Sequence, residues 1–254
     1  MNRMLRLLGL LCFLLSSCSS PFQTEQLPIQ APTFIGGLRP AEVVVPREYD
    51  HKERYPLIIL LHGYSATARL NDLIFQLERR VDIADFILLL PEGTENPDGD
   101  QFWNATPECC DYFGQGVDDV VYLTALIEEA KATLAVDPQH VVLLGHSNGG
   151  YMAYRMACEY PKLFKRIVVV AGLSFLNPQD CLGQDPVSLV HVHGTEDEVV
   201  SYDLGADEVS RWLSKGGCDT GFSLMATKDF NSGLMGEETE ILIVRGHEVC
   251  NFFV

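Results

Sequence analysis

The chain alternates between short, fully apolar runs and longer stretches in which apolar residues recur every three or four positions. Apolar runs of strand length lie at residues 41–46, 57–61, 86–90, 140–144, 166–170, 189–192 and 240–244. Helical spacing is found over residues 70–81, 118–135, 149–160 and 204–215. Apolar strands separated by helices are typical of a mostly parallel sheet that is covered on both faces. The pattern predicts one α/β domain without internal repeats.

The N-terminal segment has a different pattern. Arg3 and Arg6 precede the apolar run Leu7–Leu15, and Ser16-Ser17-Cys18 follows it. A basic start, a short apolar run and small residues predict a secretory signal peptide, and the run is too short to span a bilayer comfortably. The ending Leu-Ser-Ser-Cys resembles the bacterial lipobox, which implies lipidation of Cys18. An ordinary signal peptide that is cut nearby is the alternative.

These features predict three segments. They are a signal peptide over residues 1–17, a lipidated tether over 18–32 that carries three prolines, and an α/β domain over 33–254. We expect the protein to be exported and anchored through Cys18 to the outer membrane or cell surface, or to be secreted.

Composition and charge exclude several functional classes. The 254 residues are 47% hydrophobic, which rules out a disordered chain. The formal net charge of −17 repels phosphate backbones, so nucleic acid is not an expected partner. In an oxidising compartment, the six cysteines beyond the tether allow up to three disulfides, and the sequence leaves their pairing open. They are Cys109, Cys110, Cys158, Cys181, Cys218 and Cys250.

The candidate chemistry centres on the sequence Gly145-His146-Ser147-Asn148-Gly149-Gly150. A strand is predicted directly before this G-x-S-x-G motif and a helix directly after it. That arrangement is typical of the nucleophile elbow of α/β-hydrolases, in which the serine hydroxyl stands above the sheet edge. We therefore predict Ser147 as a nucleophile. The alternative is a glycine-rich turn without chemistry.

A serine nucleophile needs a base, and the base needs a carboxylate that orients it. In this fold the order along the chain is Ser, acid, His. Glu196 and Asp197 both follow the strand 189–192, and the Gly-x-x-Asp-x-x-Val pattern of other hydrolases selects Asp197. His247 follows the strand 240–244 and is the predicted base.

Two backbone N–H groups must stabilise the oxyanion of the tetrahedral intermediate. One is predicted at Asn148, directly after the nucleophile. The other is predicted at Tyr64, in the loop that follows the strand 57–61. Gly63 lets the backbone turn inward there, although an ordinary turn at a strand end has the same sequence.

Several further segments match one family in order along the chain. They are Leu61-His62-Gly63-Tyr64, Pro91-Glu92-Gly93, Phe102-Trp103-Asn104-Ala105, Cys109-Cys110, Val117-Asp118-Asp119-Val120, Val136-Asp137-Pro138, the 145–150 motif with Met152 and Ala153, and His193-Gly194-Thr195 with Asp197. Together they resemble the secreted esterase family that includes polyhydroxybutyrate depolymerases, feruloyl esterases and acetylxylan esterases.

The resemblance implies an α/β-hydrolase fold and ester hydrolysis through an acyl-Ser147 intermediate, without metal or organic cofactor. It places Trp103 near the acyl pocket, for which a core tryptophan is the alternative, and we also expect His146 beside the substrate. The expected substrate is a carboxylic ester of polyhydroxyalkanoate or of feruloylated or acetylated polysaccharide, as polymer or oligomer. The oligomeric state is left open.

The sequence departs from the family after residue 244. Relatives end in a helix, and here only residues 248–254 follow His247, which are too few to form it. In another register, Cys250 matches an upstream family cysteine and the catalytic histidine is absent. The alternative function is then a catalytically inactive binding lipoprotein with a hydrolase fold.

Overall fold

A computed structural model describes residues 31–181, 185, 187–218, 223–228, 239–244 and 252–253. Cys18, His247 and Cys250 lie outside these residues. Within the described part of the chain, no helix has both the length and the apolar character that crossing a membrane requires.

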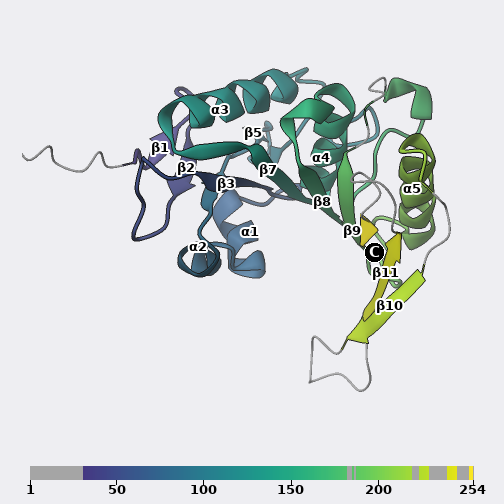
Figure 1. The fold of residues 1–254 in the computed structure, drawn as a ribbon. Helices are drawn as coiled ribbons and strands as arrows, with labels where there is room; N and C mark the ends of the chain where they lie inside the picture. The colour runs from purple at the N-terminus through teal and green to yellow at the C-terminus, as the bar shows by residue number, and fades with distance from the viewer. Residues whose placement is uncertain are drawn as a thin grey trace, which may run out of the picture. The chain divides into compact units, whose positions relative to one another are not determined.

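One large sheet of mainly parallel strands organises the domain (Figure 1). In spatial order the described strands are β1 (Phe34–Ile35), β2 (Ala41–Val44), β4 (Ile87–Leu90), β3 (Tyr55–Leu61), β7 (Val136–His146), β8 (Arg166–Val170), β9 (Ser188–Val192), β12 (Phe252–Phe253), β11 (Thr239–Val244) and β10 (Ser223–Lys228). Strands from β4 to β12 run parallel, and antiparallel pairs close both edges. This confirms the predicted mostly parallel sheet.

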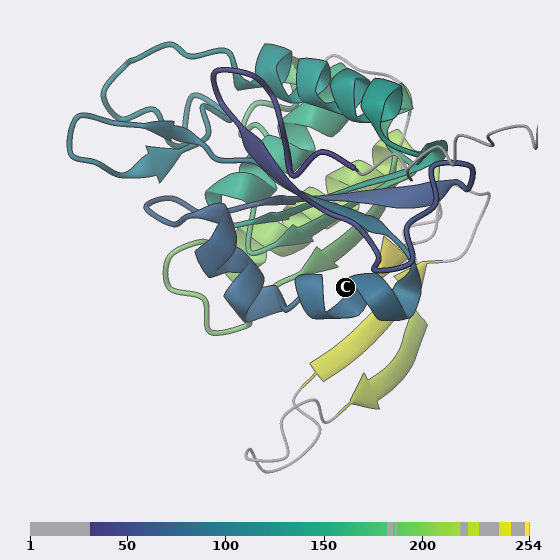
Figure 2. The same ribbon diagram turned by 90° about the vertical axis from the view of Figure 1, so that its left-hand side faces the viewer.

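Helices cover both faces of the sheet, as the continuous apolar strands predict (Figures 1 and 2). The elements α3 (Asp119–Thr133), α4 (Asn148–Glu159) and α5 (Tyr202–Lys215) lie on one face, and α1 (Ala68–Phe75) and α2 (Glu78–Ala84) lie on the other. Two short 3-10 turns, η1 (Pro161–Leu163) and η2 (Pro178–Asp180), and a small hairpin of β5 (Thr94–Glu95) and β6 (Gln101–Phe102) complete the described elements.

The core is divided by the sheet. The larger cluster includes Leu57, Leu143, Ile167 and Leu189, whose side chains are 0% exposed. A smaller cluster under α1 and α2 contains Leu60, Ala68, Val81, Phe86, Leu88 and Leu90. Because β3 and β4 contribute to both clusters, their runs are apolar at every position, and this is the signal that identified them in the sequence.

The prediction of one helix over residues 70–81 is wrong in one respect, because the structure has two helices there, α1 and α2. Gln76 adopts a left-handed conformation with φ 54°, and α1 ends there. The Asp72 side chain accepts hydrogen bonds from the backbone N–H groups of Leu77 (2.9 Å) and Glu78 (3.1 Å). These bonds satisfy amides at the start of α2, so a capping carboxylate splits a segment whose apolar spacing continues.

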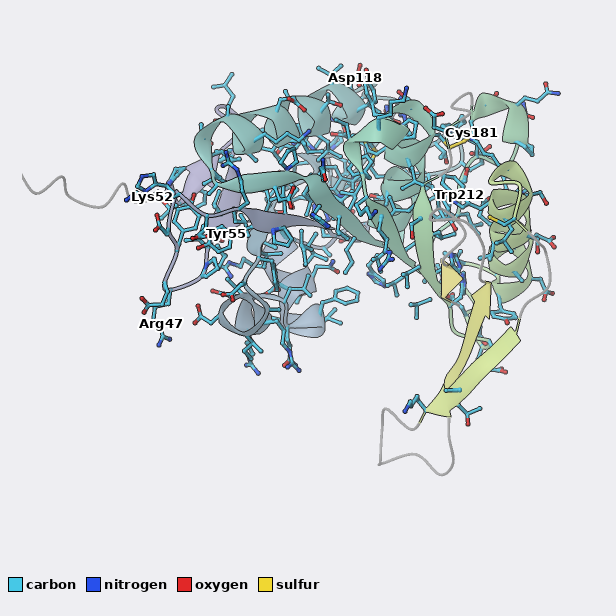
Figure 3. The ribbon with its side chains drawn as sticks, in the orientation of Figure 1. Arg47, Lys52, Tyr55, Asp118, Cys181 and Trp212 are labelled. Carbon is cyan, nitrogen blue, oxygen red and sulfur yellow. A yellow bond between two sulfur atoms is a disulfide. The ribbon has the colours of Figure 1, made fainter. Side chains whose placement is uncertain are left out.

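The other helix predictions agree with the structure within a few residues. Asp118 is the N-cap of α3: its side chain accepts a hydrogen bond from Val121 N–H at 3.0 Å (Figure 3). Val121 itself is 61% exposed and faces away from the core. The strand expected at 240–244 is present as β11. Beyond Cys218, the described residues all lie in strands.

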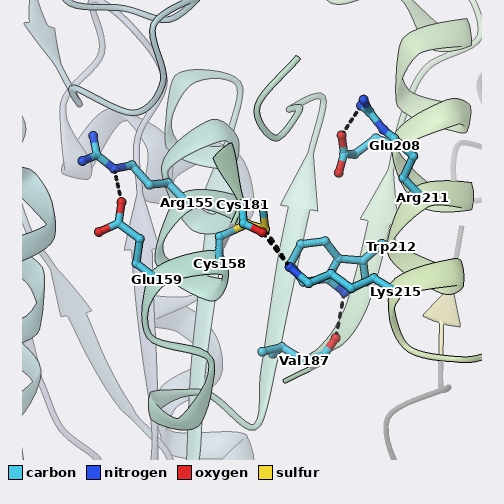
Figure 4. Close-up of a disulfide and its surroundings, with 9 residues drawn as sticks. All are labelled: Arg155, Cys158, Glu159, Cys181, Val187, Glu208, Arg211, Trp212 and Lys215. Carbon is cyan, nitrogen blue, oxygen red and sulfur yellow. Dashed lines mark hydrogen bonds and ion pairs between the residues drawn. A yellow bond between two sulfur atoms is a disulfide. The ribbon is translucent and has the colours of Figure 1, made fainter. Parts of the chain in front are cut away.

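Two disulfides join described cysteines. One links the adjacent residues Cys109 and Cys110, and the other links Cys158 of α4 to Cys181 after η2 (Figure 4). Cys218 is also disulfide-bonded. The Lys215 ammonium lies 2.8 Å from Cys181 Sγ, and Trp212 Nε1 donates to Val187 O at 2.9 Å. These contacts fix the C-terminal end of α5 beside the start of β9, at the opposite end of that strand from the site described next.

Candidate active site

Parallel register brings the ends of four strands to one edge of the sheet. Leu61 of β3 pairs with Gly145 of β7, and His146 of β7 pairs with Val170 of β8. Val170 in turn pairs with Val192 of β9. The loops that follow β3, β7, β8 and β9 therefore meet at this edge. This juxtaposition was expected, because carboxyl ends of parallel strands form the usual ligand crevice of open α/β sheets.

Ser147 occupies a tight turn between β7 and α4. Its backbone has φ 50° and ψ −119°, a region that side chains with a Cβ rarely adopt. The conformation costs on the order of 1–3 kcal/mol and is held by the surrounding structure. Ser147 N–H donates to Val170 O at 2.8 Å, and Ser147 O accepts from Tyr151 N–H at 3.0 Å. The hydroxyl hydrogen-bonds to none of the described residues.

The two outer glycines of the motif are required by close backbone contacts. A Cβ on Gly145 would lie 2.0 Å from Gly149 O. A Cβ on Gly149 would lie 2.3 Å from Leu61 O and 2.6 Å from His62 O. Real side chains do not approach so closely, so both positions exclude every residue with a side chain. The G-x-S-x-G spacing therefore places glycine at the two positions where only glycine fits.

The loop after β3 lies directly against Ser147. A Cβ on Gly63 would be 3.4 Å from Ser147 Cβ and 3.2 Å from His146 Nδ1. The backbone N–H groups of Tyr64 and Asn148 make no hydrogen bond to other described residues. Within the described part of the chain, both predicted oxyanion donors thus lack an acceptor. Asn148 is the first residue of α4, where the positive end of the helix dipole lies.

The Tyr64 side chain is anchored away from its own N–H. Its hydroxyl accepts from Asn96 Nδ2 at 2.8 Å and donates to Asp100 Oδ2 at 3.4 Å. The ring makes an edge contact with Tyr112 at 5.3 Å between centroids. These contacts fix the position of residue 64 without occupying its amide.

His62 supports the same loop from inside the protein, where it is 0% exposed. Its Nδ1 is 2.8 Å from Gly63 O, and its Nε2 is 2.8 Å from Gly93 N. A carbonyl only accepts and an amide only donates, so the proton is on Nδ1 and the ring is neutral. Burial lowers the pKa of His62 to about 4. The imidazole therefore connects the loop after β3 to the loop after β4.

Trp103 lies in the interior, with 0% of its surface exposed. Its indole Nε1 donates to His62 O at 3.0 Å, and its ring lies 5.1 Å from the His62 ring. Its backbone forms a reciprocal pair with the Asn148 side chain: Trp103 N–H donates to Oδ1 at 2.8 Å, and Nδ2 donates to Trp103 O at 2.9 Å. The buried tryptophan contacts both segments that carry the predicted oxyanion donors, whereas an open pocket wall would leave part of its ring exposed.

A buried ion pair fixes the segment that carries Trp103. Asp119 is 0% exposed, and its Oδ1 accepts from Arg39 at 2.6 Å. Its Oδ2 accepts from Asn104 N–H at 2.6 Å. Arg155 donates to Asn104 O at 2.7 Å from the opposite side. The sequence reasoning did not assign these roles, and only the resemblance to the family drew attention to Asp119 and Asn104.

Asp197 lies in the turn after β9, and its side chain is 19% exposed. Its Oδ1 accepts from the N–H groups of Val199 (2.9 Å) and Val200 (2.8 Å). These backbone hydrogen bonds, Val200 first, lower the pKa of Asp197, so it is a carboxylate at neutral pH. Oδ2 accepts no hydrogen bond from the described residues and remains available. Glu196 is exposed, as expected of a solvated neighbour.

His146 is half-buried between the loop after β3 and α1. Its ring makes an edge contact with Phe75 at 6.0 Å. Burial lowers the pKa of His146, which the charge of Asp197 partly offsets. The structure thus brings His146, Ser147, Asn148 and the Tyr64 loop together at one edge. The position of the predicted base His247 is not among the described residues.

A mostly parallel sheet with a strained serine between a central strand and a helix defines an α/β-hydrolase. The sequence profile of the Esterase family matches residues 34–216, and the chain belongs to that family. The two findings agree, because the matched region includes Ser147, Asp197 and the loop after β3.

Individual relatives are esterases by name. The chain is 28% identical over 180 residues to "Probable feruloyl esterase C" of Aspergillus niger, and the aligned region covers 68% of this chain and 60% of that protein. It is 31% identical over 101 residues to feruloyl esterase C of Emericella nidulans, covering 40% and 37%. The chain spans about half the length of the curated relatives it matches, with 42%, 61% and 60% for three of them.

Solved structures share the fold at lower identity. The acetyl xylan esterase from Aspergillus awamori has a TM-score of 0.60 at 15% identity, covering 88% of each chain. Esterase PE8 has a TM-score of 0.55 at 20% identity, covering 73% of this chain and 86% of that one. The α/β-hydrolase fold predicted from the sequence is therefore confirmed.

Proposed function

We propose that this protein hydrolyses carboxylic esters through an acyl-Ser147 intermediate. The observation that carries the proposal is the strained Ser147 turn, which stands at the N-terminus of α4 and against the loop of Gly63 and Tyr64. The helix ends at Gln76 and Asp85 have positive φ with positive ψ, the common left-handed conformation. Ser147 instead combines φ 50° with ψ −119°, which residues with a Cβ rarely adopt, and such strain is retained mainly where function requires it.

The proposed reaction has two balanced steps. Ser147 Oγ attacks the ester carbonyl while His247 accepts its proton, and the N–H groups of Tyr64 and Asn148 stabilise the oxyanion. The alcohol then leaves with that proton. Water attacks the acyl-enzyme by the reverse proton path and releases the acid. Asp197 orients His247 and stabilises its charged form through Oδ2.

The names of the relatives support a substrate class. Proteins named feruloyl esterase and acetylxylan esterase match the chain, so we propose esters of feruloylated or acetylated polysaccharide. Polyhydroxyalkanoate esters are the second substrate class of the resembling family. His146 would border the substrate, and no metal or organic cofactor takes part. We further propose export and anchoring through Cys18.

The test is hydrolysis of short p-nitrophenyl esters by the wild type and by Ser147→Ala. We expect the variant to lose turnover completely while its circular dichroism spectrum is unchanged, because only the nucleophilic oxygen is removed. Ser214→Ala is the matched control, since that hydroxyl bonds to Ser210 O on the exposed surface of α5, and it should keep full activity.

Residual hydrolysis in Ser147→Ala at the wild-type rate would refute the proposal. A wild type that is folded yet turns over no ester of any chain length would also refute it. That second result would favour the alternative of a binding lipoprotein with a hydrolase fold.

A further inference from the structure

Three buried aromatic side chains form a continuous hydrogen-bonded chain beneath the Asp197 turn. Tyr154 Oη on α4 lies 3.0 Å from His191 Nδ1 on β9. His191 Nε2 lies 3.0 Å from His193 Nδ1, and His193 Nε2 lies 2.7 Å from Val200 O. Tyr154 is 0% exposed, His191 is 1% exposed, and the side chain of His193 is 1% exposed.

The groups at both ends of this series require the same donor-to-acceptor direction for its hydrogen bonds. Val200 O can only accept, so His193 Nε2 carries a hydrogen. The buried Tyr154 hydroxyl must donate, and among the described residues its one partner is His191 Nδ1. Burial lowers the pKa of His191 to about 3, so this ring is neutral and its Nε2–H donates to His193 Nδ1. Every link is satisfied in this single arrangement.

The last residue of this hydrogen-bonded series, Val200, also binds the Asp197 carboxylate. Val200 donates its N–H to Asp197 Oδ1 at 2.8 Å and accepts from His193 through its carbonyl. His193 Nε2 is also 3.6 Å from Asp197 Oδ2. Loss of the His193 bond would release Val200, and the carboxylate would lose one of the two amides that orient it.

The two imidazoles pack closely against the start of α5. A Cβ on Gly205 of α5 would lie 2.5 Å from His193 Nδ1 and 3.1 Å from His191 Nε2. The rings of the two histidines stack at 5.3 Å, and Tyr202 contacts the outer ring edge-on at 6.0 Å. A glycine in the first turns of α5 thus provides the space that the pair occupies.

We propose that Tyr154, His191 and His193 are positioning residues that fix the Asp197 turn through a one-directional hydrogen-bond chain ending at Val200 O. This inference rests on the proposed function, in which Asp197 orients the base. Nothing in the sequence spacing of the two histidines indicates a link to Tyr154.

The kinetic test compares two substitutions at one position. The Gln side-chain amide reaches about as far as His Nε2, so His193→Gln keeps a donor for Val200 O. The amide of His193→Asn is too short for this. We expect kcat per active site to fall about 10- to 100-fold in His193→Asn, as for a misplacement near 1 Å. His193→Gln should stay within about fivefold of the wild type, and KM should change little in both.

Active sites are counted by fluorophosphonate titration, so a partly unfolded variant lowers the titrated number and leaves kcat unchanged. Tyr154→Phe breaks only the first link and should lower kcat less than His193→Asn. His140→Asn, which changes an exposed histidine in the N-terminal half of β7, is the control and should match the wild type. Equal kcat in the wild type and His193→Asn, or no recovery in His193→Gln, would overturn the proposal.

A second readout does not depend on turnover. In ¹⁵N-histidine NMR spectra of the full chain at pH 7, both His191 and His193 should show the Nε2–H tautomer. An Nδ1–H tautomer at either residue would overturn the hydrogen-bond chain. The wild type could hydrolyse no ester while both histidines show the expected tautomer. That result would refute the proposed function but would support the hydrogen-bond arrangement of Tyr154, His191 and His193.

Discussion

Acidification should destabilise the fold through His62, and the effect can be calculated from its surroundings. In the unfolded chain this imidazole has an ordinary pKa near 6.5, whereas burial lowers the pKa to about 4 in the folded protein. Its Nε2 accepts from Gly93 N–H, so a proton there would replace a hydrogen bond with a contact between two donors. The folded state therefore resists protonation that the unfolded state accepts.

The sign follows from proton linkage. Between pH 6.5 and pH 4 the unfolded state binds more protons at this site, so stability falls as the pH falls. The two pKa values give a loss of about 1.8 kcal/mol between pH 7 and pH 5. Burial raises the pKa of Glu92, whose Oε2 lies 3.6 Å from His62 Nε2, and protonation of this carboxyl acts in the opposite direction.

The assay is urea unfolding at pH 7 and pH 5, with disulfides intact. It compares a Glu92→Gln background with the same background carrying His62→Asn. Between pH 7 and pH 5, the free energy of unfolding should fall about 1.8 kcal/mol less in the protein that also carries His62→Asn than in the Glu92→Gln background. His51→Asn is the control, because that imidazole is exposed, and its pH dependence should match the background. Parallel pH curves with and without His62 would refute the reasoning.

Three further predictions concern the site. Asp119→Asn should destabilise the protein by about 3 kcal/mol in urea unfolding, because it removes the buried carboxylate that pairs with the partly buried Arg39 charge; an unchanged midpoint would contradict the assigned ion pair. Gly149→Ala should lower activity at least about 100-fold, since its methyl group would displace the loop after β3. The control Gly194→Ala, whose methyl group would meet no atom within 4 Å, should keep its activity at a similar expressed yield. His247→Ala should lower kcat by on the order of 10³ or more, and an unchanged rate would mean that a different histidine, or none, serves as base.

The parts of the fold that the sequence predicted are those determined by local pattern. Strands β3 and β4 are apolar at every position because both of their faces pack in the core, so their position follows from composition alone. The turn at Ser147 was predictable for a similar reason, because two glycines flank it at the spacing that a close backbone contact requires.

The parts that were not predicted depend on contacts between distant segments. The burial of Trp103 follows from the Asn148 side chain, 45 residues away in sequence. The Tyr154–His191 bond joins a helix to a strand 37 residues later. Neither pair has a local signature, because each partner alone is an ordinary core residue.

The break between α1 and α2 illustrates a third case. Leu70 and Leu73 fit the apolar spacing of one helix, yet they are 50% and 69% exposed. Their side chains therefore do not determine the helix boundary. Asp72 does, because its carboxylate caps the next helix. A capping residue inside a periodic segment could have been recognised only by giving local hydrogen bonding more weight than periodicity.

The central claim is that Ser147 is an activated nucleophile, and covalent labelling tests it most directly. The purified protein is treated with a fluorophosphonate probe, digested and analysed by mass spectrometry. We predict that one probe adds per chain, on Ser147, and that the adduct is absent from the Ser147→Ala variant. A folded wild-type protein that takes up no probe, or takes it up at another serine, would contradict the account.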